Sequence, residues 1–219
     1  MRATLIPAIN VDSFDEVTRR IRAIEPLATR YAIDSVHLDV ADGTFTNNTI
    51  WHNARDLVGF QTPLKIEVHL MLADMDNRID EWLFHPVGRI IFHAEACLNP
   101  ALVIQKCRDA KIGVGVSIQP EISWDTTRPF WEMIDVVQLL SVIPGHAGQA
   151  MHPDALEKIR ALRSACPSCT IEADGGVTAE NIRQFAGAGA NEIVAASAIF
   201  GRDNIEEAIK ELHYAVSSR

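Results

Sequence analysis

The hydrophobic positions of the chain follow a rhythm in which short runs rich in β-branched residues alternate with longer amphipathic stretches. The short runs are typical of buried strands, and the longer stretches are typical of helices with one apolar face. The predicted strands, in chain order, are Thr4–Ile9, Ser35–Val40, Leu64–Leu70, Arg89–His93, Gly113–Ile118, Val136–Ser141, Thr170–Asp174 and Glu192–Ala196.

Residues that favour helix N-termini precede two of the longer stretches. Ser13 has Glu16 three residues further on, which is the spacing of a capping box. Asn99 precedes Pro100, and proline is favoured in the first turn of a helix. The predicted helices are Ser13–Ile24, Pro100–Ala110, Pro153–Ala165, Thr178–Ala186 and Ile205–Val216.

Eight strands that alternate with helices predict parallel strands joined by helical crossovers. A closed barrel and an open doubly wound sheet both fit this order. The count of eight, the even spacing and the length of 219 residues favour an α/β fold of one domain, a (β/α)₈ TIM barrel over residues 1–219. No Gly-x-Gly-x-x-Gly stretch follows the first strand, which argues against a dinucleotide-binding sheet.

The composition is that of a globular protein, with 47% hydrophobic and 22% charged residues. A net charge of −9 argues against nucleic acid or an anionic membrane surface as the main partner. An anionic small ligand stays open, because loop amides and helix N-termini bind phosphate locally. The N-terminal apolar run is too short for a signal peptide, and no segment approaches the ~20 apolar residues of a membrane span. We therefore expect a cytoplasmic protein.

The four cysteines are Cys97, Cys107, Cys166 and Cys169. In the absence of a secretory signal, we expect all four to be free thiols. Cys166 and Cys169 have CxxC spacing, but a zinc ribbon needs a second pair of this kind, which the sequence lacks. We interpret this pair as structural.

Four residues suited to binding a metal lie at the carboxyl ends of predicted strands, where active sites of this fold are found: His37, Asp39, His69 and Asp174. His37 and Asp39 share a strand face because they are two residues apart. Two imidazoles with two carboxylates suit Zn²⁺, Mn²⁺, Fe²⁺ or Co²⁺ better than Ca²⁺. A single polar residue at a strand end, such as His93, is more often structural, so the prediction depends on the four together.

Turns with free backbone amides follow the predicted strands that end near residues 141, 174 and 196, and the first two of these turns contain glycines. Gly175 and Gly176 allow close backbone approach to a ligand, and Thr178 is expected to open a helix whose N-terminus favours an anion. The alternative is that these glycines only form tight turns. The predicted phosphate site consists of Gly145, His146, Ala147, Gly148, Gly175, Gly176, Ala196 and Ser197.

Several of these residues lie in stretches that resemble the ribulose-phosphate 3-epimerase family. The likeness spans nearly the whole chain, in order and at the expected intervals. The matching stretches are His37–Phe45, Val68–Met71, His93–Ala96, Ser141–Gln149, Glu172–Gly176 and Ser197–Gly201.

The resemblance implies a (β/α)₈ barrel that epimerises carbon 3 of a ketose phosphate such as ribulose 5-phosphate. It implies that Asp39 and Asp174 transfer the proton and that Met71 lines the reaction centre. It also implies one divalent metal ion, with zinc favoured among Zn, Fe, Mn and Co, and family habit favours a homo-oligomer. The implied metal ligands are His37, Asp39, His69 and Asp174.

Five positions depart from the pattern of this family. Asn10 stands nearest the place of a serine that contacts the substrate, and Ala41 and Leu140 replace methionines. Ile143 replaces an asparagine and His146 replaces a phenylalanine. The metal and proton-transfer residues are retained, so these departures concern the identity of the substrate, or activity itself, more than the type of reaction.

Three alternatives stay open. The substrate could be a hexulose phosphate such as allulose 6-phosphate, because Ala41 leaves more room than methionine. An orotidine-phosphate-type decarboxylase would need Asp-x-Lys-x-x-Asp, but counting from Asp39 the lysine position is Ala41. A non-catalytic barrel that binds sugar phosphates is compatible with the altered pocket wall, but the retained aspartates and metal ligands argue against it.

Overall fold

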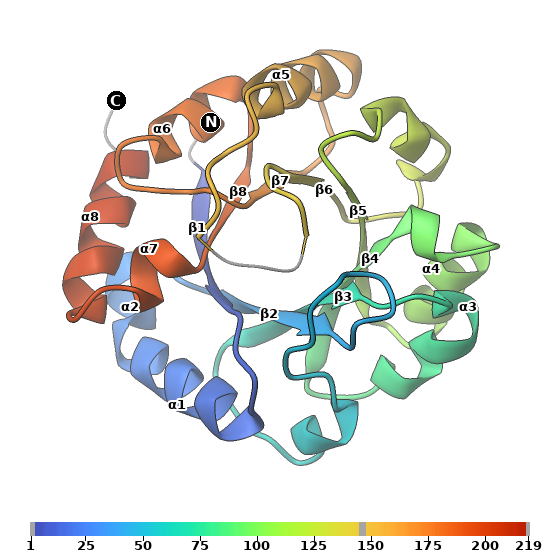
Figure 1. Cartoon of the computed structure of the whole chain (residues 1–219), viewed down its shortest axis with the longest axis horizontal. Helices are drawn as coiled ribbons and strands as arrows, with labels where there is room; N and C mark the ends of the chain where they lie inside the picture. Colours follow the sequence, from blue (N-terminus) through green and yellow to red (C-terminus); the bar gives the residue numbers. More distant parts are fainter. Residues whose placement is uncertain (1–2, 145–147, 218–219) are drawn as a thin grey trace.

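The computed structural model describes residues 3–144 and 148–217, and its eight parallel strands close into a barrel in chain order (Figure 1). β1 pairs with β2 on one side and with β8 on the other, which closes the ring. This confirms the (β/α)₈ barrel and excludes the open sheet. The strands are β1 (Thr4–Ile9), β2 (Ser35–Ala41), β3 (Lys65–Met71), β4 (Val87–His93), β5 (Gly113–Ile118), β6 (Val136–Leu140), β7 (Ile171–Asp174) and β8 (Glu192–Ala195).

The helices form an outer ring around the strands (Figure 1). The α-helices are α1 (Phe14–Ile24), α2 (Ala28–Tyr31), α3 (Met75–Arg78), α4 (Pro100–Asp109), α5 (Ala155–Ala165), α6 (Ile182–Ala188), α7 (Ser197–Phe200) and α8 (Ile205–Ser217). The 3₁₀ segments are η1 (Glu25–Leu27), η2 (Ala54–Leu57), η3 (Ile79–Trp82), η4 (Ala94–Ala96) and η5 (Trp124–Phe130). Only η2 follows β2 and only η5 follows β5 before the next strand, so these two connections lack an α-helix.

Side-chain caps explain where two of the predicted helices begin. The Ser13 hydroxyl accepts a hydrogen bond from the Glu16 amide at 3.4 Å, and Asn99 Oδ1 accepts one from the Leu102 amide at 3.3 Å. Both caps were predicted, and each satisfies an amide that the first helical turn leaves without a backbone partner. The sequence therefore located these N-termini correctly.

The helix predicted to open at Thr178 begins instead at Ile182. Asn181 Oδ1 accepts a hydrogen bond from the Thr178 amide at 2.8 Å, while Asn181 Nδ2 donates to the Gly176 carbonyl at 2.8 Å. These bonds hold residues 178–181 in a turn, since asparagine side chains compete with helical backbone hydrogen bonds. The predicted helix start was wrong for this reason.

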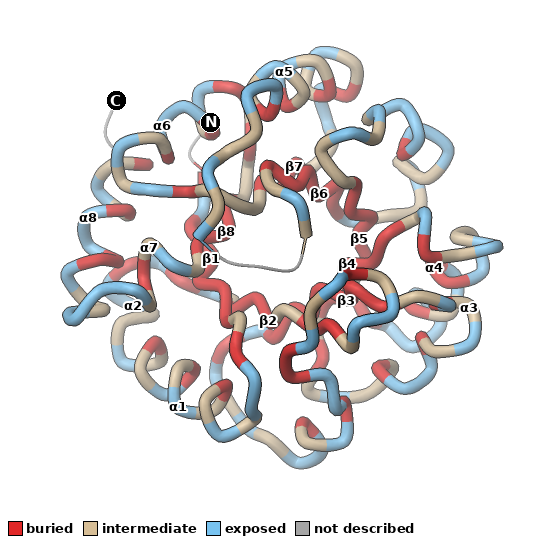
Figure 2. Tube along the Cα trace, viewed as in Figure 1, coloured by how far each residue is buried: buried red, intermediate tan, exposed pale blue. Residues whose placement is uncertain are grey.

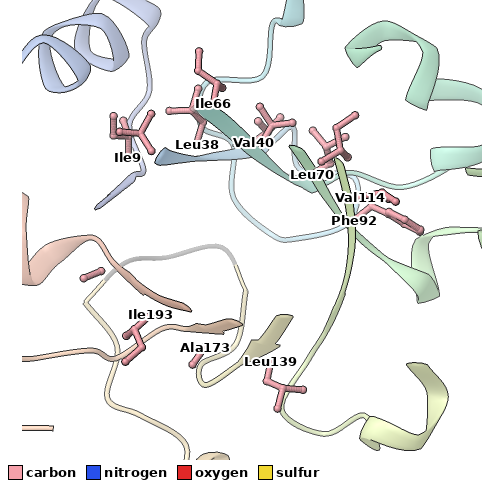
Figure 3. Packing of buried hydrophobic residues seen from close by; sticks show 14 of the residues in the cluster. Ile9, Leu38, Val40, Ile66, Leu70, Phe92, Val114, Leu139, Ala173 and Ile193 are labelled. Carbon is pink, nitrogen blue, oxygen red and sulfur yellow. The ribbon is translucent and has the colours of Figure 1, made fainter. Parts of the chain in front are cut away.

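Alternate residues of each strand point away from the barrel axis and pack beneath the helices. Figure 2 shows buried strands inside a ring of helices whose outer surfaces are exposed. Figure 3 shows such residues on all eight strands: Ile9, Leu38, Val40, Ile66, Leu70, Phe92, Val114, Leu139, Ala173 and Ile193. Because side chains alternate along a strand, the intervening residues point into the barrel.

Much of the barrel interior is polar. One apolar part of it is a small cluster of Ile6, Ala8 and Val194. The remaining interior positions include fully buried charged and polar side chains, among them His37, Glu67, Gln138 and Glu172. Burying a polar group costs free energy unless it has a hydrogen-bond or ion-pair partner. We therefore expect these interior side chains to be joined to one another by such contacts.

The expectation of four free thiols was wrong for Cys166 and Cys169, which form a disulfide in the turn between α5 and β7. The end of α5 brings their Cα atoms to 5.4 Å, within the range that a disulfide spans. Cys97 and Cys107 are free, as predicted. Burial raises the pKa of both of these thiols to about 12, so they are poor nucleophiles.

Within the described ranges, the structure contains no helix with both the length and the apolar character needed to cross a membrane.

Candidate functional site

The four predicted metal ligands converge at the carboxyl-terminal mouth of the barrel. His37 and Asp39 lie on β2, His69 faces Asp39 across the β2–β3 pairing, and Asp174 ends β7. β2 and β7 lie on opposite sides of the opening (Figure 1). One ligand atom from each of the four residues can be chosen so that all lie within 4.8 Å of one another, which is close enough to hold one metal ion.

Individual contacts define this cluster. His69 Nδ1 lies 3.1 Å from Asp39 Oδ1 and 3.8 Å from Asp174 Oδ2. His37 Nε2 lies 3.4 Å from the same Asp39 oxygen. The two aspartate side chains are 13% and 18% exposed, whereas the histidines are buried, so a ligand in the barrel mouth can reach the carboxylates.

His37 is held by Glu67, a residue that the sequence analysis did not identify. Its Nδ1 donates a hydrogen bond of 2.6 Å to Glu67 Oε1, so Nε2 is the atom that faces Asp39. Among the described residues, this buried Nε2 has no hydrogen-bond partner. Histidines that bind metals commonly donate their other nitrogen to a carboxylate in this way.

The surroundings move the pKa values of the two aspartates in opposite directions. Burial raises the pKa of the Asp174 carboxyl to about 7, and the nearby Asp39 carboxylate adds to the rise. Burial also opposes ionisation of Asp39, but its contacts with His37 and His69 outweigh this and hold its pKa well below the usual range. Near neutral pH one carboxyl can therefore hold a proton while the other accepts one, as an acid–base pair requires.

The pKa of His37 is also shifted by its surroundings. Burial favours the neutral ring, but the carboxylates of Asp39 and Glu67 outweigh burial and raise the pKa of His37 well above its usual value. The carboxylates around this ring therefore stabilise positive charge at the centre of the cluster, where a cation would be held.

A buried ionic network supports the cluster from below. Arg89 on β4 contacts Glu67 through Nε, and its Nη2 lies 3.1 Å from Glu172 Oε2 and 2.7 Å from Glu192 Oε2. Gln138 Nε2 donates to Glu172 Oε1 at 2.9 Å. The network joins β3, β4, β6, β7 and β8 beneath the mouth, so it restrains the strands that carry the cluster.

The sequence contained a signal for part of this network. Glu67 lies two residues before His69 on the same strand, so strand alternation places both on the inner face. The contact between Nε2 of His69 and Nε2 of His93, at 3.0 Å, had no comparable signal. His93 served in the sequence analysis only as an example of a strand-end residue without function, because its neighbour on β3 could not be known.

A pocket opens above the cluster and contains most of the other predicted site residues. It encloses about 520 Å³ of space that is open to solvent on one side. Asn10 lines it and donates from Nδ2 to Asp39 Oδ2 at 2.9 Å, so this residue also holds one of the aspartates. The predicted residues that line the pocket are Asn10, Asp39, His69, Met71, Gly148, Asp174, Gly175, Gly176, Ala196 and Ser197.

Two glycines of the predicted phosphate site have backbone conformations that other residues rarely adopt. Gly175 has φ +104° and Gly176 has φ +64°. A Cβ atom at Gly176 would lie 2.6 Å from the backbone nitrogen of Met151, so the two loops approach each other closely here. Gly145, His146 and Ala147 of the predicted site lie outside the described residues, and so does the substitution at His146.

The substitutions that distinguish the chain from the family pattern do not all face the pocket. Leu140 lines it, as Asn10 does. Ala41 is fully buried against Ile50 and Met71 and is not among the lining residues. Ile143 is 61% exposed and does not line the pocket either. Among the described positions, the altered wall therefore consists of Asn10 and Leu140.

The sequence is similar to a known family and to proteins named after its activity. The model of the family described as "Ribulose-phosphate 3 epimerase family" matches residues 5–200. The chain is 32% identical to "Ribulose-phosphate 3-epimerase" of Synechocystis sp. over 210 residues, which covers 93% of the chain and 90% of that protein. It is 30% identical to the Bacillus subtilis protein of the same name over 212 residues, which covers 94% of the chain and 96% of the relative.

Solved structures share the fold at lower sequence identity. Orotidine 5'-phosphate decarboxylase from Pyrococcus horikoshii OT3 matches with a TM-score of 0.68 at 16% identity, over 99% of the chain and all of that protein. The 3-hexulose-6-phosphate synthase from Salmonella typhimurium also matches with a TM-score of 0.68, at 13% identity, covering 99% of the chain and 98% of that structure. At such low sequence identities, these matches show that the fold is shared and indicate nothing about function.

Proposed function

Since the chain belongs to the ribulose-phosphate 3-epimerase family, and is accordingly an isomerase acting on carbohydrates, we propose that it epimerises carbon 3 of a ketose phosphate of the ribulose 5-phosphate type. Asp39 and Asp174 are the proton-transfer pair of this reaction. The observation that carries the proposal is the position of these two carboxyls at the mouth, on strands from opposite sides of the barrel, with pKa values moved in opposite directions.

Epimerisation beside a carbonyl removes a proton from one face of a carbon and returns a proton to the other face. The intermediate is a planar enediolate, so two groups on opposite sides are needed. In the proposed reaction Asp39, which is ionised, accepts the proton, and Asp174, whose pKa in the metal-free protein is about 7, exchanges a proton near neutral pH and donates it to the other face. In the reverse direction the two exchange roles. Positioned acid–base groups of this kind contribute about 10² to 10⁴-fold in rate.

A divalent metal ion fits the residues of the cluster. His37 and His69 offer Nε2 and Nδ1, and Asp39 and Asp174 offer one oxygen each, which favours zinc among Zn²⁺, Fe²⁺, Mn²⁺ and Co²⁺. The unpartnered Nε2 of His37 supports this assignment. When bound, the metal supplies Lewis-acid stabilisation of the negative charge that develops on the substrate oxygen.

In this proposal the substrate phosphate binds in the loops after β6, β7 and β8. Gly148, Gly175, Gly176, Ala196 and Ser197 line the pocket, and because their side chains are small or absent the phosphate can approach the backbone. In (β/α)₈ barrels the loops after the last two strands commonly bind phosphate. The binding energy of this remote group holds carbon 3 between the two aspartates.

The structure removes the reason for expecting a hexulose phosphate. The extra room expected at Ala41 is taken up by its packing against Ile50 and Met71, and it does not open into the pocket. A decarboxylase of the orotidine type is not supported, because Ala41 occupies the position of its lysine. The retained aspartates and metal-binding residues argue against a binding-only role.

The proposal is tested by NMR with the zinc-loaded protein in D₂O, using ribulose 5-phosphate and allulose 6-phosphate in parallel. We expect deuterium at carbon 3 and formation of the epimer, faster with ribulose 5-phosphate. Faster turnover of allulose 6-phosphate would assign the hexulose instead. No exchange with either compound at saturating zinc would favour the binding-only barrel.

A further inference from the structure

We propose that His93 is a positioning residue for His69. Nε2 of His93 accepts a hydrogen bond from Nε2–H of His69, so that Nδ1 of His69 stays free to bind the metal. The inference rests on the proposed function, because it matters only if His69 is a metal ligand. It assigns a role to a buried residue that does not line the substrate pocket.

The position of His93 follows from the strands. It is the last residue of β4, which pairs with β3, and it shares the inner face of β4 with Arg89 and Ile91. His93 is fully buried, and its Nε2 lies 3.0 Å from His69 Nε2. The two rings lie 5.2 Å apart between centroids, at an angle of 31°.

The hydrogen-bond requirements of the two rings then determine their tautomers. A bond between two imidazole nitrogens needs one N–H and one bare nitrogen. In the metal-free structure His69 Nδ1 lies 3.1 Å from Asp39 Oδ1, where an N–H donates to the carboxylate. A bound cation needs this nitrogen bare, so in the metal-loaded protein the proton of His69 lies on Nε2. Nε2 of His93 is therefore the acceptor, and the proton of His93 lies on Nδ1.

Two further contacts favour this orientation of the His93 ring. Nδ1 lies 3.4 Å from Oε1 of Glu95, which follows in η4; the contact lacks hydrogen-bond geometry, but it places the protonated nitrogen next to a carboxylate. The ring of Phe45, from the loop after β2, lies over His93 with 4.6 Å between centroids. With Phe45 on one face and Glu95 at one edge, Nε2 of His93 remains directed at His69.

The role of His93 is distinguished from simple core filling by the acceptor atom. Glutamine can place an oxygen acceptor near the position of the imidazole Nε2, whereas leucine fills similar space without an acceptor. If only packing matters, both substitutions should have similar effects. If the acceptor matters, His93→Gln should retain what His93→Leu loses.

The experiment measures zinc affinity by competition with a chromogenic chelator, together with the visible absorption spectrum of the cobalt-loaded protein. We expect His93→Leu to weaken zinc binding about 10- to 100-fold, which is the usual cost of removing a group that orients a metal ligand. His93→Gln should stay close to the wild type in both measurements. The matched control is Phe92→Leu, a buried neighbour on β4 that belongs to the core packed beneath the helices.

Each other result overturns the inference in a distinguishable way. Wild-type protein that takes up neither zinc nor cobalt overturns the proposed metal site and this inference with it. Equal affinity of wild type and His93→Leu overturns the inference alone. So does a loss in His93→Gln or Phe92→Leu as large as that in His93→Leu, because the effect would then be general loosening of β4.

If His93→Leu does not fold, the tautomers of the zinc-loaded wild type decide the question. Long-range ¹H–¹⁵N correlation spectra report which nitrogen of each imidazole carries hydrogen. We expect protonated Nε2 on His69 and protonated Nδ1 on His93. The reverse assignment on His93 would overturn the proposal.

Discussion

At the scale of single residues, Asp39 and Asp174 carry the same side chain in different surroundings. Asp39 lies against two imidazoles and accepts a hydrogen bond from Asn10, so its ionised form is stabilised. Asp174 is withdrawn from water, and the nearby charge of Asp39 adds to the effect, so its protonated form is stabilised. In the proposed reaction, these chemically identical groups thereby serve as a base and an acid, as a two-sided proton transfer requires.

The first prediction concerns the proton held by Asp174. Asp174→Asn keeps the shape of the side chain but cannot exchange a proton, so turnover should fall by about 10² to 10⁴-fold. Thermal unfolding and circular dichroism of the zinc-loaded variant check that the fold is retained. The control is Asp34→Asn, an exposed aspartate just before β2 at the opposite end of the barrel, which should leave turnover unchanged. Near-normal turnover of Asp174→Asn would remove this residue from the acid–base pair.

The second prediction concerns stability of the metal-free protein against pH. The pKa of Asp174 is about 7 in the folded protein against an ordinary value of 3.8, so the folded state retains a proton that the unfolded chain releases. Protonated Asp174 therefore stabilises the folded state relative to the unfolded state. This contribution is fully present below the pKa of Asp174 in the unfolded chain, 3.8, and it is lost as the pH rises through its pKa in the folded protein, about 7. Asp174→Asn removes this loss. The difference in unfolding free energy, variant minus wild type, should therefore grow by a few kcal/mol between about pH 5 and pH 8.

Denaturant titrations of both metal-free proteins over this pH range measure the difference. Parallel pH profiles for wild type and Asp174→Asn would contradict the raised pKa of this carboxyl.

At the scale of elements, the loop after β7 connects the acid–base site to the predicted phosphate site. Asp174 ends the strand, and Gly175 and Gly176 follow at once with positive φ angles. The turn at residues 178–181 that displaces the start of α6 is tied to Gly176 through Asn181. The loop is therefore held both by backbone conformation and by a side-chain hydrogen bond.

The third prediction concerns this loop. Gly176→Ala places a Cβ atom 2.6 Å from the backbone nitrogen of Met151, in addition to the cost of a left-handed conformation. Gly59→Ala is the matched control, because Gly59 also has a positive φ, of +78°, but nothing lies within 4 Å of the added atom. The control should lose about 1–2 kcal/mol of unfolding free energy, and Gly176→Ala should lose more.

Kinetics separate the two glycine variants further. Gly176→Ala should raise KM for the phosphorylated substrate because the loop must shift, whereas Gly59→Ala should not change KM. Equal losses of stability and unchanged KM in both variants would show that the contact with Met151 does not restrain the loop.

At the scale of the whole molecule, the proposed metal site joins distant parts of the barrel. Its four ligands come from β2, β3 and β7, which are brought together only when the barrel closes. A ligand set of this kind does not exist in the unfolded chain, so metal binding should contribute directly to folding stability. A homo-oligomer and a cytoplasmic location stay predictions.

The fourth prediction concerns removal of the metal. Zinc at about 100 times its dissociation constant should stabilise the folded protein by about 2.7 kcal/mol, and a chelator should reverse this. Thermal unfolding with zinc and with chelator measures the effect. His69→Ala should show little shift in Tm with zinc and low zinc content by elemental analysis. An unchanged metal content in His69→Ala would show that the ligand set is wrong.

Local patterns in the sequence were sufficient for the architecture and for the convergence of the four predicted ligands. Alternation along β2 placed His37 and Asp39 on one face, and the capping residues Ser13 and Asn99 located two helices, because these signals depend on neighbours in the chain. The same rule of alternation could have identified Glu67. The family-like stretches added the reaction, although the substitution at Ala41 was expected to open space that packing in fact fills.

Only the tertiary structure decided how these residues influence one another. The contact of His93 with His69 depends on which strand lies beside which and at what register, and neither is written in one segment of the chain. The opposite pKa shifts of Asp39 and Asp174 depend on burial and on charges brought from other strands. The sequence by itself determined the barrel and the position of the four predicted ligands at its mouth, because strand periodicity is local. The difference between the two aspartates that the proposed reaction uses arose only in the closed barrel, because electrostatic interactions depend on distance in space and on exclusion of water.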